Sequence, residues 1–378
     1  MVSRETQEQI SSIDKQIKEL AAQRLKLATE SDASMLKSEA AIKNRAYERE
    51  FMSSIESHDI NMESCERVLF RTLFNLSHSY SASQIGHKSA LSEQISKALT
   101  DTPKVFPTKA LVACQGVEGA YSQIACDKMF NSANIMFFRT FEGVFQAVEN
   151  RMVEYGVLPI ENSSYGSVTA VYDLMKSHHF HIVRSYKLQI RHRLLAKPGT
   201  NFENIREVFS HEQAIGQCSA FFKDNKQIKV TIVENTAIAA KMVADSDRDD
   251  VAAISSSDCS TLYGLNIIKD DIVNSDHNFT RFICITKDLK IFPGANRASI
   301  MLALGHTPGA LSNTLARFSA LGLNLTKIES RPIQGRDFEF MFYLDIDASI
   351  YSDAFVNLLC QLDQDPEAFT YLGSYSEF

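Results

Sequence analysis

Short apolar runs alternate with longer amphipathic segments between Lys109 and about Asp288, and this alternation most constrains the fold. The apolar runs, each a strand candidate, are LVAC, IMFF, YGVLPI, EVFS, VTIV and VAAI. Three segments between them have helical spacing: EGVFQAVEN, EQAIGQCSAFF and NTAIAAKMVA. Strands that alternate with helices predict an α/β unit of parallel sheets with crossover helices. Ligands bind in such units where strands end and helices begin, so functional residues are expected at those junctions.

The first hundred residues have a different character and predict an all-α module. Residues 5–95 contain no proline and only one glycine, Gly86. Apolar residues in steps of three and four form a helix seam that Arg24 completes: Ile10, Ile13, Ile17, Leu20 and Leu27. Further helices are expected over 45–55 and 69–84, and such a module can need a second copy to cover its seam. TDTPKVFPTK, at residues 100–109, carries two prolines and is expected to be a linker.

Residues 297–378 predict a third module, a small ferredoxin-like sandwich. The pattern is strand SIMLAL, helix GALSNTLARFSAL, strands NLTKIES and FEFMFYLDI, helix SDAFVNLLCQL and strand TYLGSY. Modules with this βαββαβ order often bind regulators or pair with one another, and the fold alone does not say which. The predicted domains are therefore 1–100, 109–288 and 297–378, a reasonable division for a chain of 378 residues.

Composition argues against several classes of function. The formal net charge is −7 and no basic block stands out, which argues against a nucleic-acid surface. No apolar run approaches the ~20 residues of a membrane span, so no membrane partner is expected. The polar N-terminus, MVSRETQEQI, is unlike a secretory signal. The seven cysteines are scattered without a C-x-x-C pair, so we expect reduced thiols, mostly core filler, in a cytoplasmic protein.

Five short polar segments, here called stations, lie at the predicted junctions between secondary-structure elements of the central segment. They are GVEGAYS, PIENSSYGSV, SHEQA, ENTA and HNFTRF. An N-cap needs only one polar residue, so the cluster after Pro159 favours a ligand pocket over a solvated loop. His211 taken alone is more often a capping or core histidine than a catalyst. The G-x-x-G turn lacks both the third glycine of a dinucleotide fingerprint and the Gly-Lys-Ser of a P-loop. No metal-ligand spacing appears, and we expect a hydrogen-bonding site for a small polar anion.

These stations, in this order, resemble the prephenate dehydratase family over roughly residues 109–288. The motifs that carry the resemblance are GVEGAYS, GVLPIENSSYGSV, SHEQA, ENTAIAA and NFTRF. The C-terminal segment, with PGAL at 308–311 and NLTKIESRP at 324–332, resembles the regulatory ACT domain of that family. The first hundred residues look like the helical chorismate mutase domain of bifunctional bacterial enzymes. The resemblance implies a two-lobed α/β dehydratase domain, like a periplasmic binding protein, between a helical domain and a ferredoxin-like ACT domain.

The resemblance implies that prephenate is converted to phenylpyruvate with loss of water and carbon dioxide. Thr280 would hydrogen-bond the departing 4-hydroxyl, because a hydroxyl is too weak an acid to protonate it outright. Arg281 would grip the side-chain carboxylate through two hydrogen bonds. Phe282 and Tyr121 would wall the ring carboxylate, which must leave as neutral carbon dioxide. The other stations would position the substrate: Ser122, Glu161, Asn162, Ser163, Gly166, His211, Gln213 and Thr236. Aromatisation drives the reaction, so no cofactor is expected.

For the C-terminal domain, the resemblance implies phenylalanine as a feedback inhibitor bound between paired domains. The residues implied are Gly309, Ala310, Leu311, Asn324, Leu325, Glu329, Ser330, Arg331 and Pro332. A purely structural dimerisation domain is the alternative. A homodimer or homotetramer is expected in both cases.

For the N-terminal domain, the resemblance implies a cationic site for the chorismate dianion. Three residues fall where the mutase pattern needs them: Arg24, Glu48 and Gln84. A lone arginine in an apolar seam is costly unless it meets an anion. Four positions depart from the pattern. Gln7 stands where the pattern has an arginine, and Met35 where it has a lysine. Asn44 and Tyr47 replace the Asp and Arg of a D-x-x-R-E motif. The domain is either a divergent mutase or a relic kept for dimerisation, and the lost cations favour the relic.

Two alternatives for the whole chain stay open at this point. Arogenate carries an amine where prephenate has a ketone, and the residues do not choose between these substrates. A non-catalytic amino-acid sensor is a different class of function, since two-lobed α/β folds with ACT domains can simply bind their ligands.

Overall fold

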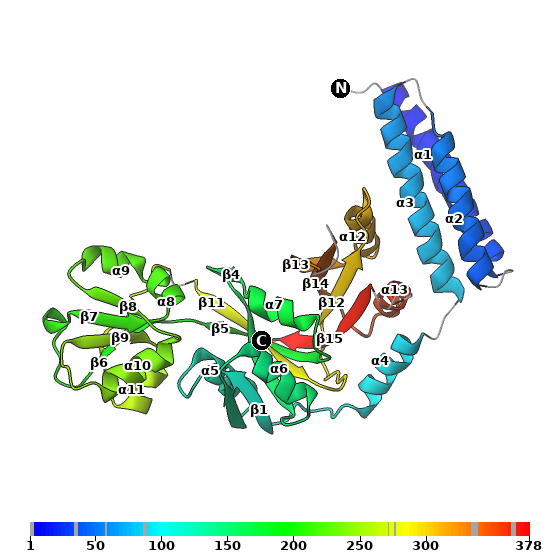
Figure 1. Cartoon of the computed structure of the whole chain (residues 1–378). Helices are drawn as coiled ribbons and strands as arrows, with labels where there is room; N and C mark the ends of the chain where they lie inside the picture. Colours follow the sequence, from blue (N-terminus) through cyan, green and yellow to red (C-terminus); the bar gives the residue numbers. More distant parts are fainter. Residues whose placement is uncertain are drawn as a thin grey trace. The chain divides into compact units, whose positions relative to one another are not determined.

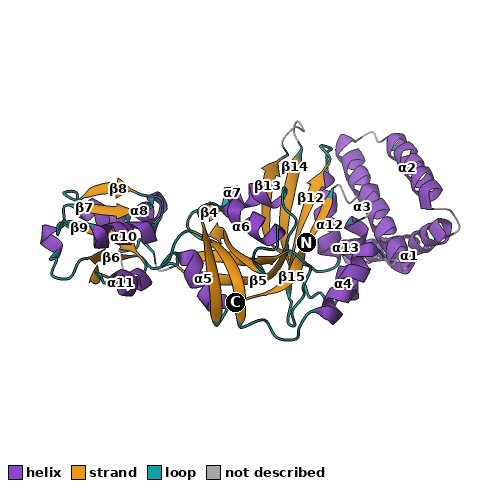
Figure 2. Cartoon of the chain, turned by 60° about the horizontal axis from the view of Figure 1, so that its bottom comes forward, coloured by secondary structure: helices purple, strands orange, loops and turns teal. Residues whose placement is uncertain are grey.

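The computed structural model describes residues 4–33, 37–56, 59–85, 89–270, 272–275, 277–333, 339–363 and 368–378. For residues 31–33, 37–45, 75, 78–79 and 82–85 only the backbone is described. The chain divides into two compact units: residues 1–96 with 300–371, and residues 97–299 with 372–378 (Figures 1 and 2). Within the described residues, no helix combines the length and the apolar character that crossing a membrane requires.

Three long helices form the N-terminal part of the first unit, as predicted: α1 (Arg4–Ala33), α2 (Lys37–Ser54) and α3 (Ile60–Ile85). Asp59 caps α3 by accepting a hydrogen bond from the backbone N–H of Asn61 at 2.8 Å. Arg67 donates to Met52 O at 2.6 Å and to Ile55 O at 2.8 Å, which satisfies carbonyls at the end of α2. A fourth helix, α4 (Ala90–Asp101), was not expected from the sequence.

The predicted seam of α1 is exposed, and Arg24 does not belong to it. The side chains of Ile10, Leu20 and Leu27 are 49%, 64% and 66% exposed. Arg24 instead contacts α3, donating to Leu73 O at 3.4 Å and to the hydroxyl of Ser77, with its guanidinium 4.8 Å from the Phe74 ring centre. These polar and aromatic partners reduce the cost of placing Arg24 beside an apolar seam, and its predicted contact with an anion stays a prediction.

The C-terminal elements appear in the predicted βαββαβ order. They are β12 (Arg297–Leu304), α12 (Ala310–Ala320), β13 (Asn324–Pro332), β14 (Phe340–Asp347), α13 (Asp353–Leu362) and β15 (Phe369–Glu377). Their strands are ordered β13-β14-β12-β15, so the first and third strands of the module lie in the centre. Apolar residues such as Phe318 of α12 and Phe355 of α13 are buried. β15 contributes its first residues to the first unit and its last to the second.

The second unit contains two lobes, each built on one sheet (Figure 2). The first lobe orders its strands β15-β5-β11-β3-β1-β2. Its elements are β1 (Lys109–Gln115), α5 (Tyr121–Met129), β2 (Ser132–Phe138), α6 (Phe141–Glu149), β3 (Tyr155–Asn162), β4 (Gly166–Ser167), α7 (Thr169–Met175), β5 (His181–Gln189) and β11 (Phe279–Thr286).

The second lobe orders its strands β10-β6-β9-β7-β8. Its elements are β6 (Arg193–Ala196), the 3-10 helix η1 (Phe202–Asn204), β7 (Glu207–Ser210), α8 (Glu212–Gln217), α9 (Ser219–Asp224), β8 (Lys229–Ile232), α10 (Thr236–Asp245), β9 (Val251–Ser255), α11 (Ser257–Tyr263) and β10 (Asn266–Lys269). The single helix expected over EQAIGQCSAFF is two, because Cys218 leaves helical geometry between α8 and α9.

The prediction of parallel sheets with crossover helices is confirmed only in part, since both sheets are mixed. β1 pairs in parallel with β2 and β3, but β11 runs antiparallel to β3 and β5. In the second lobe, β7 is parallel to β8 and β9, whereas β6 is antiparallel to β9. The cause is the chain path: the chain leaves the first lobe after β5, builds the second lobe and returns as β11. The returning strand therefore enters the first sheet in the opposite direction.

Most of the cysteines fill cores, as predicted. Five are buried, Cys114, Cys126, Cys218, Cys259 and Cys284, and all are free thiols. Cys114, Cys126 and Cys284 pack with Val112, Val157 and Phe282 in the first lobe. Burial raises the pKa of the Cys218 thiol to about 12, so this group stays protonated and unreactive at neutral pH.

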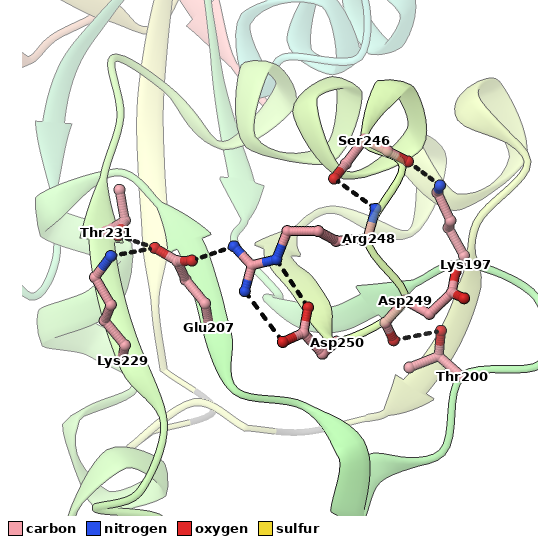
Figure 3. Close-up of polar contacts among 9 residues, drawn as sticks. All are labelled: Lys197, Thr200, Glu207, Lys229, Thr231, Ser246, Arg248, Asp249 and Asp250. Atoms are coloured by element: carbon pink, nitrogen blue, oxygen red, sulfur yellow. Dashed lines mark hydrogen bonds and ion pairs between the residues drawn. The ribbon is translucent and has the colours of Figure 1, made fainter.

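A buried carboxylate closes the amino ends of the strands in the second lobe (Figure 3). Glu207 opens β7, and its carboxylate accepts from Thr231 Oγ1 at 2.7 Å and pairs with Lys229 Nζ at 2.8 Å. Arg248 reaches the other oxygen at 2.6 Å and also pairs with Asp250 at 2.8 Å. These donors lower the pKa of Glu207 to about 2. The cluster stabilises the end of the lobe opposite to the predicted site.

Candidate functional site

Two polar edges of the second unit carry the predicted site residues. The first edge has Ser122 at the start of α5, Asn162 at the end of β3 and Thr280 at the start of β11. On the second edge, His211 precedes α8 and Thr236 begins α10. Because α8 and α10 follow parallel strands of one sheet, their first residues lie at the carboxyl ends of those strands.

Direct contacts hold the two edges together. In the turn after β1, Glu118 O accepts a hydrogen bond from Tyr263 Oη at 2.9 Å. Gly119 O accepts from Cys259 Sγ at 3.3 Å, and a Cβ on Gly119 would lie 2.8 Å from that sulfur. Gly119 also has φ +87°, so glycine is needed in this turn for both its backbone conformation and its close approach to the second lobe.

Asn162 is the centre of the hydrogen-bond network on the first edge. Its Oδ1 accepts from the backbone N–H groups of Ser164 at 2.9 Å and Tyr165 at 3.0 Å. A backbone N–H can only donate, so these contacts determine the orientation of the amide. Nδ2 therefore donates to Asn278 Oδ1 at 2.8 Å and to Thr280 Oγ1 at 3.0 Å. All four hydrogen-bonding positions of the Asn162 amide are used.

The same network leaves the Thr280 hydroxyl as a donor for a ligand. Thr280 Oγ1 accepts from Asn162, so the Thr280 proton can be donated elsewhere. Asn278 directs its Oδ1 to Asn162, and its Nδ2 is buried without a hydrogen-bond partner among the described residues. Asn278 therefore helps to hold the Asn162 amide that contacts Thr280. No role for Asn278 followed from the sequence, where it stood only as part of HNFTRF.

Thr280 and Arg281 lie on opposite faces of β11. Cross-strand register pairs Thr280 with Asn162 and Arg281 with Glu161, and neighbouring residues of a strand point to opposite faces. Phe282 is 2% exposed and packs in the core of the first lobe, beneath the strand that carries Thr280. Phe282 thus supports the strand, and its predicted part in a substrate wall stays a prediction.

The guanidinium of Arg281 is almost fully buried among charged groups of the protein. Its side chain is 9% exposed and lies 3.6 Å from Glu161 Oε2 and 3.9 Å from Glu377 Oε2. These two carboxylates already neighbour the guanidinium. The predicted contact of Arg281 with a substrate carboxylate stays a prediction. Glu161, predicted to contact substrate, faces Arg281.

Several predicted substrate-binding residues also have structural roles. Ser163 accepts from Phe279 N at 2.9 Å and donates to His277 O at 2.9 Å, which holds the start of β11. His211 caps α8, with Nδ1 accepting from Gln213 N at 3.3 Å, and burial lowers the pKa of His211. Gly166 turns the chain with φ +77°.

Thr236 and Ser122 are buried, whereas Gln213 is exposed. The capping role that the sequence favoured for His211 is confirmed. Contacts of all these residues with a substrate stay predictions.

His192 was not identified from the sequence and lies in the segment that joins the lobes. Its Nδ1 is 3.1 Å from Tyr121 Oη of the first lobe, and its Nε2 is 2.7 Å from Gln217 Oε1 of the second. Burial lowers the pKa of His192 to about 4, so the ring is neutral at physiological pH. A histidine between two apolar strands gave no sequence signal, because its partners are far apart in the chain.

The predicted regulatory residues fall on one turn and on two faces of one strand. Gly309, with φ +84°, precedes α12, which begins with Ala310 and Leu311. In β13, residues 325, 327, 329 and 331 are half-buried, whereas residues 324, 326, 328 and 330 are exposed. Glu329 and Arg331 therefore share a face that excludes Ser330, whereas a β-bulge between Leu325 and Lys327 interrupts the alternation before Asn324 and Leu325.

The predicted mutase-like residues are only partly described. Arg24 is engaged by α3, and Glu48 lies in α2. The side chains of Asn44 and Gln84 lie outside the described residues. In the part of the chain that the structure describes, no three His, Cys, Asp or Glu side chains gather closely enough to hold a metal ion.

Comparisons with known proteins show which family the chain is similar to. Residues 112–290 match the family model described as prephenate dehydratase. The chain is 39% identical over 284 residues to arogenate dehydratase/prephenate dehydratase 2, chloroplastic, of Arabidopsis thaliana, covering 71% of this chain and 73% of that protein. It is 30% identical over 378 residues to the bifunctional chorismate mutase/prephenate dehydratase of Escherichia coli K12, covering 97% and 94%. A prephenate dehydratase from Arthrobacter aurescens, solved in complex with L-Phe, matches with TM-score 0.65 and 26% identity over 70% of this chain and 89% of that one.

Proposed function

The chain belongs to the prephenate dehydratase family, and from this premise we propose that it converts prephenate to phenylpyruvate with loss of water and carbon dioxide. The observation that carries the proposal is the amide of Asn162, which donates to Thr280 and Asn278 while its orientation is held by two backbone N–H groups. This arrangement leaves the Thr280 hydroxyl proton as a positioned donor for an oxygen atom of the ligand.

In the proposed mechanism, Thr280 assists departure of the 4-hydroxyl. The hydrogen bond from Asn162 to Thr280 Oγ1 polarises the hydroxyl and strengthens the hydrogen bond that it donates to the leaving oxygen. The C–O bond breaks with its electron pair, and the leaving oxygen takes a proton from solvent and departs as water. The electrons of the carbon–carboxylate bond move into the ring, which becomes aromatic, and the carboxylate leaves as carbon dioxide. Thr280 keeps its own proton throughout.

Substitutions at Thr280 test this role. Thr280→Val removes the hydroxyl at nearly constant volume, and we expect kcat to fall by about 10²- to 10⁴-fold, the usual contribution of a positioned proton donor. Thr280→Ser is the matched control, because it keeps the hydroxyl and should retain most of the activity. Formation of phenylpyruvate is followed by absorbance, and thermal unfolding checks the fold. Equal rates for the valine and serine variants would contradict the role of the hydroxyl.

Arogenate is a second candidate substrate, favoured by one observation. The plant relative with 39% identity is named for both arogenate and prephenate dehydration. The relative that matches the whole chain is named for prephenate alone, and on that ground we place prephenate first. Parallel assays with both substrates, with phenylpyruvate and phenylalanine as the respective products, decide between them. If the purified chain converted neither, the sensor alternative would stand.

We further propose that the C-terminal module, residues 297–378, is an ACT domain that binds phenylalanine. The related Arthrobacter aurescens protein was solved with L-Phe, which supports a phenylalanine-responsive family member. The turn at Gly309 and the face of β13 shared by Glu329 and Arg331 form the proposed site. Gly309→Ala strains the left-handed turn, so inhibition by phenylalanine should weaken by about tenfold. Inhibition as strong as in the wild type would exclude this turn from the site.

For the N-terminal helices, we propose a dimerising relic of a chorismate mutase. The exposed seam of α1 supports pairing with a second copy, because long apolar stripes are rarely left in water. The intramolecular partners of Arg24 support loss of the dianion site. An assay with chorismate and a molar-mass measurement by light scattering test the two parts. Turnover at ordinary mutase rates would refute the relic, and a monomer would refute the pairing.

A further inference from the structure

We propose that Glu377, near the C-terminus, is a positioning residue for the dehydratase reaction, acting through Arg281 on the neighbouring Thr280. This inference rests on the proposed function. It assigns a role in the reaction to the last strand of the chain, β15, through contacts that lie wholly within the second unit.

Three cations converge on the carboxylate of Glu377. Lys187 Nζ lies 2.7 Å from Oε1 and Arg297 3.8 Å from the same oxygen, while Arg281 lies 3.9 Å from Oε2. Ser185 Oγ donates to Oε2 at 3.4 Å. The Glu377 side chain is 14% exposed, so these charges interact with limited screening by water.

Backbone pairing determines where this carboxylate sits. β15 runs parallel to β5, with Ser376 opposite Arg184 and Glu377 opposite Ser185. Phe378 N donates to Ser185 O at 3.0 Å, and Phe378 O accepts from Lys187 N at 2.8 Å. Because Ser376 pairs with β5 and Phe378 is hydrogen-bonded to it, the sheet itself determines the position of the Glu377 carboxylate, which serves as a fixed counter-charge near Arg281.

Two carboxylates near Arg281 come from strands other than β11. Glu161 comes from β3 on one side of β11, and Glu377 from β15 beyond β5 on the other. A nearly buried guanidinium shifts when one of its counter-charges is removed, because losing a charge partner in a buried site is strongly unfavourable. Thr280 immediately precedes Arg281 in β11. A shift of Arg281 would therefore disturb the hydrogen bond that Asn162 Nδ2 donates to Thr280 Oγ1 at 3.0 Å.

Kinetics of full-length variants test the proposal. We expect Glu377→Gln, which keeps the shape but removes the charge, to lower kcat on the order of tenfold, since small displacements of reacting groups have effects of this size or larger. KM should stay within twofold, because the proposed role of Glu377 concerns the leaving-group step at Thr280. Glu377→Asp, which keeps the charge, should recover part of the lost kcat.

Two matched controls separate this role from general stability. Lys187→Met removes the nearest partner of Glu377, a side chain that is 53% exposed, and leaves the contacts of Arg281 in place. Ser376→Ala removes a hydrogen bond from the same strand to Gly294 O. Both controls should keep kcat within twofold of wild type.

The possible outcomes distinguish this inference from the proposed function. If Glu377→Gln keeps the wild-type kcat while Thr280→Val does not, the positioning role is wrong and the proposed function stands. If Ser376→Ala lowers kcat as much as Glu377→Gln does, a purely structural effect of β15 replaces the proposal. If the wild type converts neither prephenate nor arogenate, the proposed function fails and this inference fails with it.

Discussion

Replacing Asn162 with aspartate tests the geometry of the site most sharply. Asp keeps the two hydrogen bonds that Asn162 accepts from Ser164 N and Tyr165 N at 2.9 and 3.0 Å. It loses the two that Nδ2 donates to Asn278 and Thr280 at 2.8 and 3.0 Å. The new carboxylate oxygen would instead accept the Thr280 proton and attract Asn278 Nδ2. The Thr280 proton proposed for the substrate would thereby be turned away from it.

The expected magnitude follows from the donors lost. Removing one preorganised donor from a developing charge costs on the order of 10²- to 10³-fold in kcat, about 3–4 kcal/mol of activation free energy. The added negative charge should also raise KM, because prephenate is a dianion. The fold should change little, since a carboxylate accepts backbone N–H bonds at least as well as an amide oxygen does.

The assay compares kcat, KM and melting temperature for the wild type, Asn162→Asp and Asn162→Ala. We expect the aspartate variant to lose activity at a nearly unchanged melting temperature. The alanine variant loses the accepted bonds as well, so it should lose both activity and stability. A kcat for Asn162→Asp within about threefold of wild type, in a folded protein, would refute the role assigned to the amide donors.

Three further predictions concern stability. The pKa of Glu207 is about 2 in the fold against an ordinary 4.5, so its stabilisation is present above pH 4.5 and lost as the pH falls toward 2. Glu207→Gln should lower the free energy of unfolding by about 2 kcal/mol at pH 7 and not at pH 2, and an equal loss at both would contradict this. Burial lowers the pKa of His192 from 6.5 to about 4, so the unfolded chain takes up this proton first as the pH falls. The contribution of His192 to the free energy of unfolding, measured with urea, should therefore be the same at every pH above 6.5 and should fall by about 3 kcal/mol toward pH 4. His192→Gln should remove this pH dependence. An unchanged pH dependence in the variant would count against the assignment to His192. Gly373 has φ +133°, and a Cβ at this position would lie 2.4 Å from Ile182 O, so Gly373→Ala should cost more than about 2 kcal/mol. Gly199 is the matched control, because it has φ +87° but a Cβ there would meet no neighbouring atom. Gly199→Ala should therefore lower the free energy of unfolding by only about 1 kcal/mol. Equal losses for the two variants in thermal unfolding would show that crowding at Gly373 has no effect.

Local patterns in the sequence predicted most elements and the polar stations. The apolar runs of the central segment became β1, β2, β3, β7, β8 and β9, and the βαββαβ order of the C-terminal module is confirmed. Side-chain periodicity and turn residues act over a few positions, so they can be identified without long-range information. Strand direction cannot: the antiparallel entry of β11 depends on a return path of about ninety residues through the second lobe, which no local pattern records.

The same division holds for the site. The sequence alone determined that polar residues cluster at strand ends, and their order carried the family resemblance, because residue types and short spacings are local properties of the chain. Only the tertiary structure decided which of them meet: Asn162 with Thr280 and Asn278, and Arg281 with Glu377, which lies 96 positions away in the chain. Register and face decide those encounters, since one residue along a strand reverses the direction of a side chain. That is why adjacent Thr280 and Arg281 face different partners across the same sheet.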